Sequence, residues 1–138
     1  MNKKKINANK ELQIILGIDD NNKILYIKRL MLSAGEPLYI TQAYFPGDIF
    51  SSIDEKYLTD LSFTKIVEDY FNLEITHRKR ILYPDIPDKE TIEVLKIKEK
   101  KIITYIQTFW TVDYKGQERI IYFEEYFKGS KSKFIFES

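Results

Sequence analysis

Apolar and polar residues alternate most clearly between Lys23 and Pro46, in the run KILYIKRLMLSAGEPLYITQAYFP. Side chains alternate between the two faces of a strand, so this run predicts a first strand with apolar residues on both faces. One of these faces combines an arginine with apolar residues: Leu25, Ile27, Arg29 and Met31. The turn residues Ala34-Gly35-Glu36 then predict a reversal into a second strand that ends at Pro46. The sequence therefore predicts a long hairpin that is covered on both sides.

The segment before this hairpin predicts a short helix. Asn9 is a suitable N-cap, Lys10–Leu16 carries apolar residues at helical spacing, and Gly17 is a suitable stop. The preceding residues, Met1–Ala8, are polar and basic, and we expect them to form a tail or an initial strand. The turn-forming run Asp19–Asn22 then leads into the hairpin.

After the hairpin, the period of the apolar residues changes from strand to helix and back. Within 54–72 it predicts two helices, the second of them capped by Ser62 or Thr64. The later elements are expected in this order: a strand over 73–83 that Pro84 and Pro87 end, a helix capped by Asp88, strands over 102–112 and 117–128, and a last strand over 133–136. Strands joined by tight turns pair in an antiparallel manner, so we expect an α+β domain: an antiparallel sheet with its helices collected on one side.

The composition indicates one folded domain without a strongly charged partner. The chain has 138 residues, of which 43% are hydrophobic and 14% aromatic. Its net charge of +1 gives no overall attraction to nucleic acid or to an anionic membrane. With no cysteine and a single histidine, His77, it can form neither a thiolate zinc site nor a cluster of histidine ligands. No apolar run approaches the roughly 18 residues of a membrane span. We therefore expect a cytoplasmic protein without a metal or a cofactor.

Basic residues offer two candidate sites. Arg29 lies among apolar neighbours and needs an anionic or carbonyl partner, either a carboxylate of the protein or a bound ligand. The run His77–Arg80 is divided between two strand faces, and we interpret it as a solvated edge rather than as a patch that binds anions or nucleic acid.

Acidic and aromatic residues give no sign of catalysis. Glu124 and Glu125 are adjacent on a strand and point to opposite faces, so they cannot act as one acid–base pair. The aromatic residues of the last two long strands, among them Trp110 and Phe123, are interpreted as sheet core or dimer surface rather than as a platform for a ligand. The chain is therefore not expected to be an enzyme.

Four segments together resemble a known family. They are IKRLMLSAGEPLYITQAYFP, the Ser62-Phe63 start of a helix, ETIEVLKI, and ERIIYFEEYFKGSKSKFIF, and they occur in a familiar order and at familiar spacings. In this respect the chain resembles the UTRA domain, the effector-binding half of GntR-type bacterial transcription regulators of the histidine-utilisation-repressor subfamily. The resemblance extends from about Leu12 to Phe136, and its most specific part surrounds Arg29 and Gly35.

The resemblance implies a chorismate-lyase-like α+β fold, a homodimer and a pocket for a small-molecule effector. Occupancy of this pocket would alter DNA binding by a separate winged helix-turn-helix domain. We expect residues 1–138 to be a single UTRA-like effector-binding domain, with the N-terminal winged-helix domain absent from this chain. DNA would then be a partner only through that missing domain.

The resemblance also suggests which residues line the pocket. The expected Arg-x-Arg clamp for an anion reads Arg29-Leu30-Met31 here, and the glutamate expected in the returning strand is Thr41. The Ser-x-Tyr motif at the helix start reads Ser62-Phe63-Thr64. In the penultimate strand, a glutamate of the family corresponds to Ile121 and a tyrosine to Phe127. These replacements predict a more apolar pocket than that of sugar-phosphate-binding relatives.

Strand alternation leads to a similar site. A cavity between the Arg29 face of the sheet and the Ser62 helix would have apolar walls and few polar anchors: Arg29, Thr41, Ser62 and Glu125. Such a site fits an organic anion with apolar character. In the competing interpretation, Arg29 and Glu125 form an internal ion pair that leaves no charged anchor for a ligand.

Three functions follow from these observations. The first is an effector-sensing, dimerising domain of a transcription regulator that carries out no catalysis. The second is an enzyme of the chorismate-lyase type, which the loss of one arginine and two glutamates from the family pattern disfavours. The third is a degenerate domain that only dimerises, with its pocket filled by its own side chains.

Overall fold

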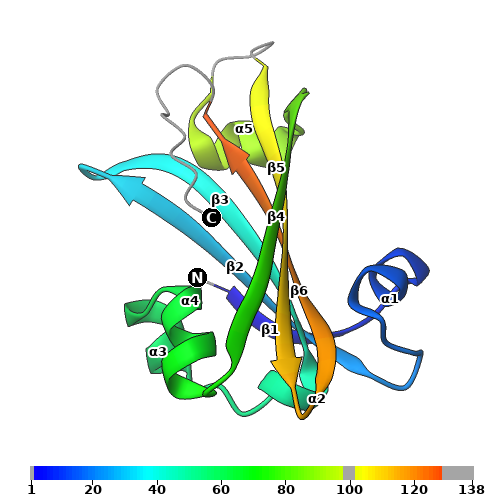
Figure 1. Cartoon of the computed structure of the whole chain (residues 1–138). Coiled ribbons are helices and arrows are strands. Elements are labelled where there is room, and N and C mark those ends of the chain that lie inside the picture. Colours follow the sequence, from blue (N-terminus) through cyan, green and yellow to red (C-terminus); the bar gives the residue numbers. More distant parts are fainter. Residues whose placement is uncertain (1, 98–101, 129–138) are drawn as a thin grey trace.

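Within residues 2–97 and 102–128, which the computed structural model describes, six strands form one antiparallel sheet (Figure 1). In chain order they are β1 (Asn2–Asn7), β2 (Lys23–Ser33), β3 (Glu36–Pro46), β4 (Glu74–Asp85), β5 (Ile103–Tyr114) and β6 (Gln117–Phe127). Their order across the sheet is β1-β2-β3-β6-β5-β4. The α+β class and the antiparallel sheet are therefore confirmed.

Short helices connect the strands. They are α1 (Lys10–Leu16), α2 (Gly47–Phe50), α3 (Glu55–Asp60), α4 (Phe63–Lys65) and α5 (Lys89–Leu95), and α4 continues as the π-helical turn η1 (Ile66–Tyr70). The expected caps of three helices are present, since the side chains of Asn9, Ser62 and Asp88 each accept a backbone N–H of the first turn. α2 was not predicted, because four residues are too few to show a helical period.

Two tight turns define the long hairpins. Ala34 and Gly35 join β2 to β3 with φ values of 51° and 79°, and Lys115 and Gly116 join β5 to β6 with 51° and 81°. Paired positive φ values suit the right-handed twist of the flanking strands, and glycine adopts them at no steric cost. Both predicted hairpins are therefore confirmed.

One face of the sheet packs against α2, α3, α4 and η1. Its core includes fully buried residues of three central strands and of the helices: Leu25, Ile27, Phe45, Phe50, Leu58, Ile66, Val67 and Ile121. The ring of Phe45 lies 5.0 Å from that of Phe50 and 5.9 Å from that of Phe123. This packed core fixes β2, β3 and β6 relative to the helices.

The other face is covered by α1 and α5, so the helices do not lie on one side as the sequence predicted (Figure 1). Leu16 of α1 packs with Ile24 and Tyr122, which alternate with the residues of the first core. On α5, Glu90 forms an ion pair of 2.6 Å with Lys28, which shares a face with Ile24. The prediction failed because amphipathic patterns show which side of a helix is buried, but not which face of the sheet receives it.

The boundaries of the outer strands also differ from those expected. β4 continues through Pro84 to Asp85, because β4 is at the edge of the sheet, where a residue without an N–H is tolerated. The N-terminal segment forms the strand β1 and pairs with β2. The predicted strand over 133–136 lies outside the described residues.

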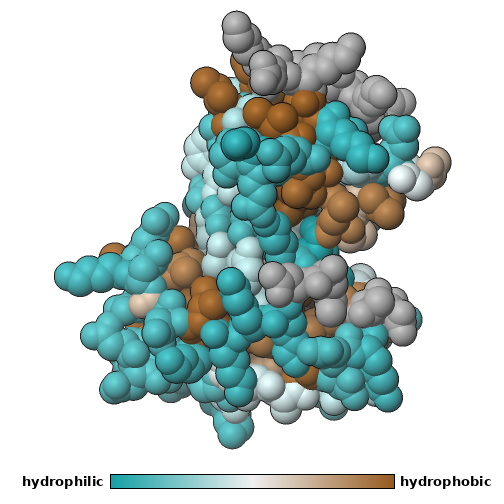
Figure 2. Space-filling model, turned by 180° about the vertical axis from the view of Figure 1, so that it is seen from behind, coloured by the Kyte–Doolittle hydropathy of each residue, from teal (hydrophilic) through white to brown (hydrophobic). Residues whose placement is uncertain are grey.

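The face seen from behind is mostly hydrophilic, with its apolar side chains gathered mainly in the upper half (Figure 2). Large hydrophobic residues that are exposed include Leu30 and Leu32 on β2 and Leu82 on β4. Among the described residues, no helix has the length and apolar character needed to cross a membrane.

Candidate functional site

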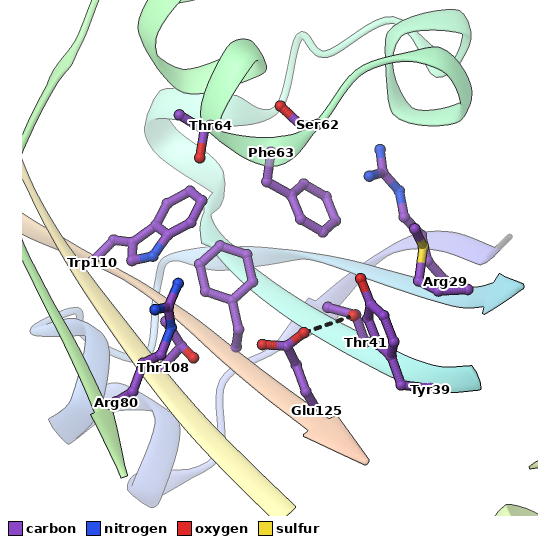
Figure 3. A pocket seen from close by; sticks show the side chains of 12 residues that line it. Arg29, Tyr39, Thr41, Ser62, Phe63, Thr64, Arg80, Thr108, Trp110 and Glu125 are labelled. Atoms are coloured by element: carbon purple, nitrogen blue, oxygen red, sulfur yellow. Dashed lines mark hydrogen bonds between the residues drawn. The ribbon is translucent and has the colours of Figure 1, made fainter. Parts of the chain in front are cut away.

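The packed sheet face opens into a pocket of about 240 Å³ beside the start of α4 (Figure 3). β3 lies between β2 and β6, so Thr41 pairs with both Arg29 and Glu125. β6 in turn lies between β3 and β5, and its residue Phe123 pairs with Thr108. Cross-strand partners in an antiparallel sheet share a face, and these residues therefore form one floor. This volume is below the roughly 300–1,000 Å³ of sites for drug-sized ligands, so the pocket has room only for a small molecule.

Seven of the nine predicted residues line this pocket: Arg29, Met31, Thr41, Ser62, Phe63, Thr64 and Glu125. The other two do not. Ile121 is fully buried in the core opposite Trp110, and Phe127 stacks on Tyr39 with ring centres 4.3 Å apart. Parity alone places Ile121 and Phe127 on the correct face, but it does not show how far along the strand the pocket extends. Ligand binding by the other seven stays a prediction.

The pocket has five further lining residues: Tyr39, Arg80, Thr108, Trp110 and Phe123. Tyr39 and Phe123 each precede a predicted residue by two positions, so strand alternation alone could have found them. Arg80, Thr108 and Trp110 lie on β4 and β5, and joining them to the site requires the register of the sheet. Trp110 was predicted to lie in the core or at a dimer surface, and its indole in fact also lines the pocket.

Arg29 finds its partners in the backbone of α3. Its Nη2 donates to the carbonyl of Leu58 and, at 3.1 Å, to that of Leu61, the C-cap residue. Its guanidinium lies over the ring of Phe63, 4.0 Å from the ring centre. Burial lowers the pKa of Arg29 from its ordinary value. Arg29 therefore holds the end of α3, where helical carbonyls lack intrahelical partners, against the pocket.

Glu125 has a different partner. Its Oε2 accepts a hydrogen bond of 3.3 Å from Thr41 Oγ1. Burial raises the pKa of Glu125, while the bond from Thr41 and the positive charge of Arg80 act in the opposite direction. Within the described residues, Arg29 and Glu125 form no ion pair, so the competing interpretation from the sequence is wrong in this respect.

Glu124 points to the opposite face, as alternation predicted. Its carboxylate accepts a hydrogen bond from the hydroxyl of Tyr105, and its cross-strand partners are Gln42 and Gln107. Burial and the contact with Glu124 raise the pKa of Tyr105 far above its ordinary value. The two glutamates therefore lie in separate environments.

The basic run of β4 contributes two arginines to the pocket side. Arg78 and Arg80 pair with Trp110 and Thr108, respectively, whereas Lys79 pairs with Phe109 on the other face. The guanidinium of Arg78 lies 5.1 Å from the centre of the Trp110 ring, and its Nη2 donates to Thr64 Oγ1 at 3.4 Å. The predicted division between two faces is confirmed, but the solvated-edge interpretation is incomplete, because Arg78 is half-buried and Arg80 lines the pocket.

Three buried polar atoms have no hydrogen-bond partner among the described residues: Arg29 Nε, Thr108 Oγ1 and Trp110 Nε1. All three belong to residues that line the pocket. Most buried polar groups in proteins are hydrogen-bonded, so such a concentration at one place needs an explanation. Arg29 Nε belongs to the guanidinium that stacks on Phe63, whereas Thr108 and Trp110 present their groups from neighbouring inward positions of β5.

Known structures share this fold. A GntR-family transcriptional regulator from Enterococcus faecalis V583 aligns with 18% identity and a TM-score of 0.88, over 99% of this chain and 96% of that chain. YydK from Bacillus subtilis subsp. subtilis str. 168 aligns with 18% identity and a TM-score of 0.87, over 100% of this chain and 59% of that chain. The effector domain of PhnF from Mycobacterium smegmatis aligns with 12% identity and a TM-score of 0.79, over 99% and 84%. These identities show the fold alone.

Sequence comparison identifies the family. Among proteins with curated functions, none matches this sequence. The sequence pattern that defines the UTRA domain matches residues 1–132, which is nearly the whole chain. The resemblance found in the sequence is therefore confirmed, and the chain belongs to the UTRA domain family.

Proposed function

We propose that this UTRA domain binds a small organic anion with apolar character, and that binding changes the DNA affinity of a winged-helix domain in the same regulator. The observation that carries the proposal is a pocket with aromatic walls that also contains two arginines and one carboxylate. Concave, mostly apolar sites with a few polar groups are typical of small-molecule binding. Such a regulator would act in the cytoplasm.

The pocket residues favour a monoanion over a sugar phosphate. Arg29 and Arg80 contribute two positive charges and Glu125 one negative charge, which leaves a net charge of +1. The walls include Phe63 and Phe123, which favour an apolar ligand body. Met31 offers no hydrogen-bond donor to a phosphate group.

We also propose that the domain is a homodimer in which the effector selects one arrangement of the two copies. A ligand shifts such an equilibrium only through its different affinities for the two states. Exposed Leu30 and Leu32 on β2 give apolar surface that a second copy would bury. Light scattering after size exclusion should give twice the mass of the chain, and a monomer at all concentrations would contradict this part of the proposal.

We propose binding without catalysis. Among the residues that line the pocket, Glu125 is the only carboxylate, and it already accepts a hydrogen bond from Thr41. An acid for the chorismate-lyase type of reaction would have to be this residue. Conversion of chorismate by the purified chain would overturn this part of the proposal. The alternative of a dimerisation-only module would require a filled interior, whereas the pocket measures about 240 Å³.

A thermal-shift screen tests the main proposal. Apolar carboxylates, amino acids and sugar phosphates are compared, and the carboxylates should raise the melting temperature most. A ligand at 100 times its Kd stabilises the folded state by about 2.7 kcal/mol. Met31→Trp should block the pocket and abolish the shift. Lys79→Trp should preserve it, because Lys79 is an exposed residue of β4 that lies next to Arg80 on the opposite face and does not line the pocket. Stabilisation that survives Met31→Trp would place the ligand elsewhere.

A further inference from the structure

We infer that the acidic group of the effector is a carboxylate and that it binds at the β5 end of the pocket, to Thr108 Oγ1 and Trp110 Nε1 beside Arg80. This inference rests on the proposed function and assigns a specific subsite within it. It moves the anion away from Arg29, the anchor that the sequence predicted.

The two donors are buried and have no partner within the described protein. Thr108 and Trp110 are only 3% and 8% exposed, and both line the pocket. Neither Thr108 Oγ1 nor Trp110 Nε1 has a partner among the described residues. A buried polar group without a partner destabilises a protein, and a ligand that supplies the partner recovers this loss on binding.

Together the two atoms favour an anionic acceptor. An indole N–H can only donate, so its partner is an acceptor, and a threonine hydroxyl can donate to the same group. Residues two apart on a strand stand roughly 7 Å apart, which allows both donors to converge on one carboxylate. Arg80 is the cross-strand partner of Thr108 and adds a positive charge at this end, as Figure 3 shows. Hydrogen bonds to an ionised acceptor are stronger than those to a neutral one.

Several other polar groups of the pocket already have partners among the described residues. Arg29 donates to two carbonyls of α3, and Ser62 Oγ accepts the Lys65 N–H at 3.2 Å as a cap. Thr64 and Thr41 bind Arg78 and Glu125, respectively. These contacts shape the pocket. Arg29 Nε also has no partner, but its guanidinium is already held by the two carbonyls, whereas Thr108 Oγ1 and Trp110 Nε1 are unused donors at neighbouring inward positions of β5.

The pocket also restricts the charge and shape of the ligand. Glu125 stands on the same floor, and its carboxylate, when ionised, repels a dianionic phosphate more strongly than a monoanion. The rings of Phe63 and Phe123 lie 5.4 Å apart and form an apolar wall. A flat monocarboxylic acid matches both features, with its body against the rings and its carboxylate at Thr108.

Trp110 makes the inference directly measurable, because it is the only tryptophan of the chain. Its indole N–H gives a single side-chain signal of this kind in a ¹⁵N–¹H spectrum, which can be followed during titration with benzoate and trans-cinnamate. We expect a saturable downfield shift of the indole proton with the acids. The neutral amides benzamide and cinnamamide should bind at least about tenfold more weakly.

Variants separate the subsite from the pocket as a whole. Thr108→Val removes one donor at nearly constant shape and should weaken cinnamate binding about tenfold or more. Trp110→Phe should have a similar effect. Thr111→Val is the matched control, because Thr111 lies on β5 with the opposite parity and does not line the pocket. It should leave cinnamate affinity unchanged.

The outcomes distinguish the two proposals. If cinnamate binds in a Met31-dependent manner while the indole signal stays in place and Thr108→Val binds equally well, the subsite is wrong and the proposed function stands. Tighter binding of glucosamine 6-phosphate than of either acid, lost in Thr108→Val, would overturn the carboxylate assignment. If neither acids nor sugar phosphates bind the chain, the proposed function itself fails together with the inference.

Discussion

The same face of the sheet has two ends with different properties. At one end, Leu25 and Ile27 of β2 are completely buried beneath the helices. At the other, Arg29 and Met31, next in the same alternation, are only half-buried and line the pocket. β6 shows the same change. Ile121 is completely buried in the core, whereas Glu125, two inward-facing positions further along the strand, lines the pocket.

This difference shows where on the sheet a ligand site can form. Alternation decides which face a residue occupies, whereas the reach of α2, α3 and η1 decides whether that face is sealed. Under the helices, apolar side chains fill the space. Beyond them, polar side chains appear, and some lack partners within the described protein.

The largest expected effect is at the packed end. Phe45 is fully buried and its ring contacts those of Phe50, Phe63 and Phe123. Phe45→Ala should therefore lower the free energy of unfolding by about 3–5 kcal/mol. Chemical denaturation in urea, followed by circular dichroism, measures this change.

Phe127→Ala is the matched change at the open end, where one stacking contact with Tyr39 is prominent. This substitution should lower the free energy of unfolding by about 1 kcal/mol. Equal losses of unfolding free energy in Phe45→Ala and Phe127→Ala would show that the two ends are packed alike, and would contradict the difference described above.

Arg29 gives the next largest effect. Arg29→Met removes the donor for the carbonyls of Leu58 and Leu61, and should cost about 1–3 kcal/mol of stability. Its effect on cinnamate affinity should be smaller than that of Thr108→Val. If Arg29→Met instead abolishes binding and leaves the melting temperature unchanged, Arg29 is a ligand anchor and not a structural residue.

Glu125 should give a smaller effect that depends on pH. Its pKa is raised in the folded state, so the protonated form favours folding. This contribution is complete below the ordinary glutamate pKa of about 4.3 and is lost as the pH rises through the raised value. Glu125→Gln should therefore be more stable than the wild type at pH 7, by less than about 1 kcal/mol, and equally stable near pH 4. Melting curves across this range test the sign, and a variant less stable at pH 7 would contradict it.

Much of the fold was predictable because its signals are local. The caps Asn9, Ser62 and Asp88 and the turn at Gly35 depend on residues close in sequence, and strand alternation placed Glu124 and Glu125 on opposite faces. The faces covered by α1 and α5 were not predictable in this way, because they depend on the order of the strands.

The site was only partly predictable for the same reason. Parity and resemblance together named the β2, β3 and α4 side of the pocket, including Arg29 and Thr41. Thr108 and Arg80 meet there only because β5 pairs with β6 and with β4. That Arg29 binds carbonyls of α3 is likewise a long-range fact, because Arg29 and Leu58 are 29 positions apart along the chain.

The central claim is that the open end keeps polar groups for a ligand at a cost to its own stability. The melting temperature of Thr108→Val, measured with and without trans-cinnamate, tests it most directly. Removal of an unpartnered buried hydroxyl should leave the ligand-free protein as stable as the wild type or more stable, while most of the stabilisation by cinnamate is lost. A ligand-free variant that melts well below the wild type, yet gains as much from cinnamate, would contradict the account.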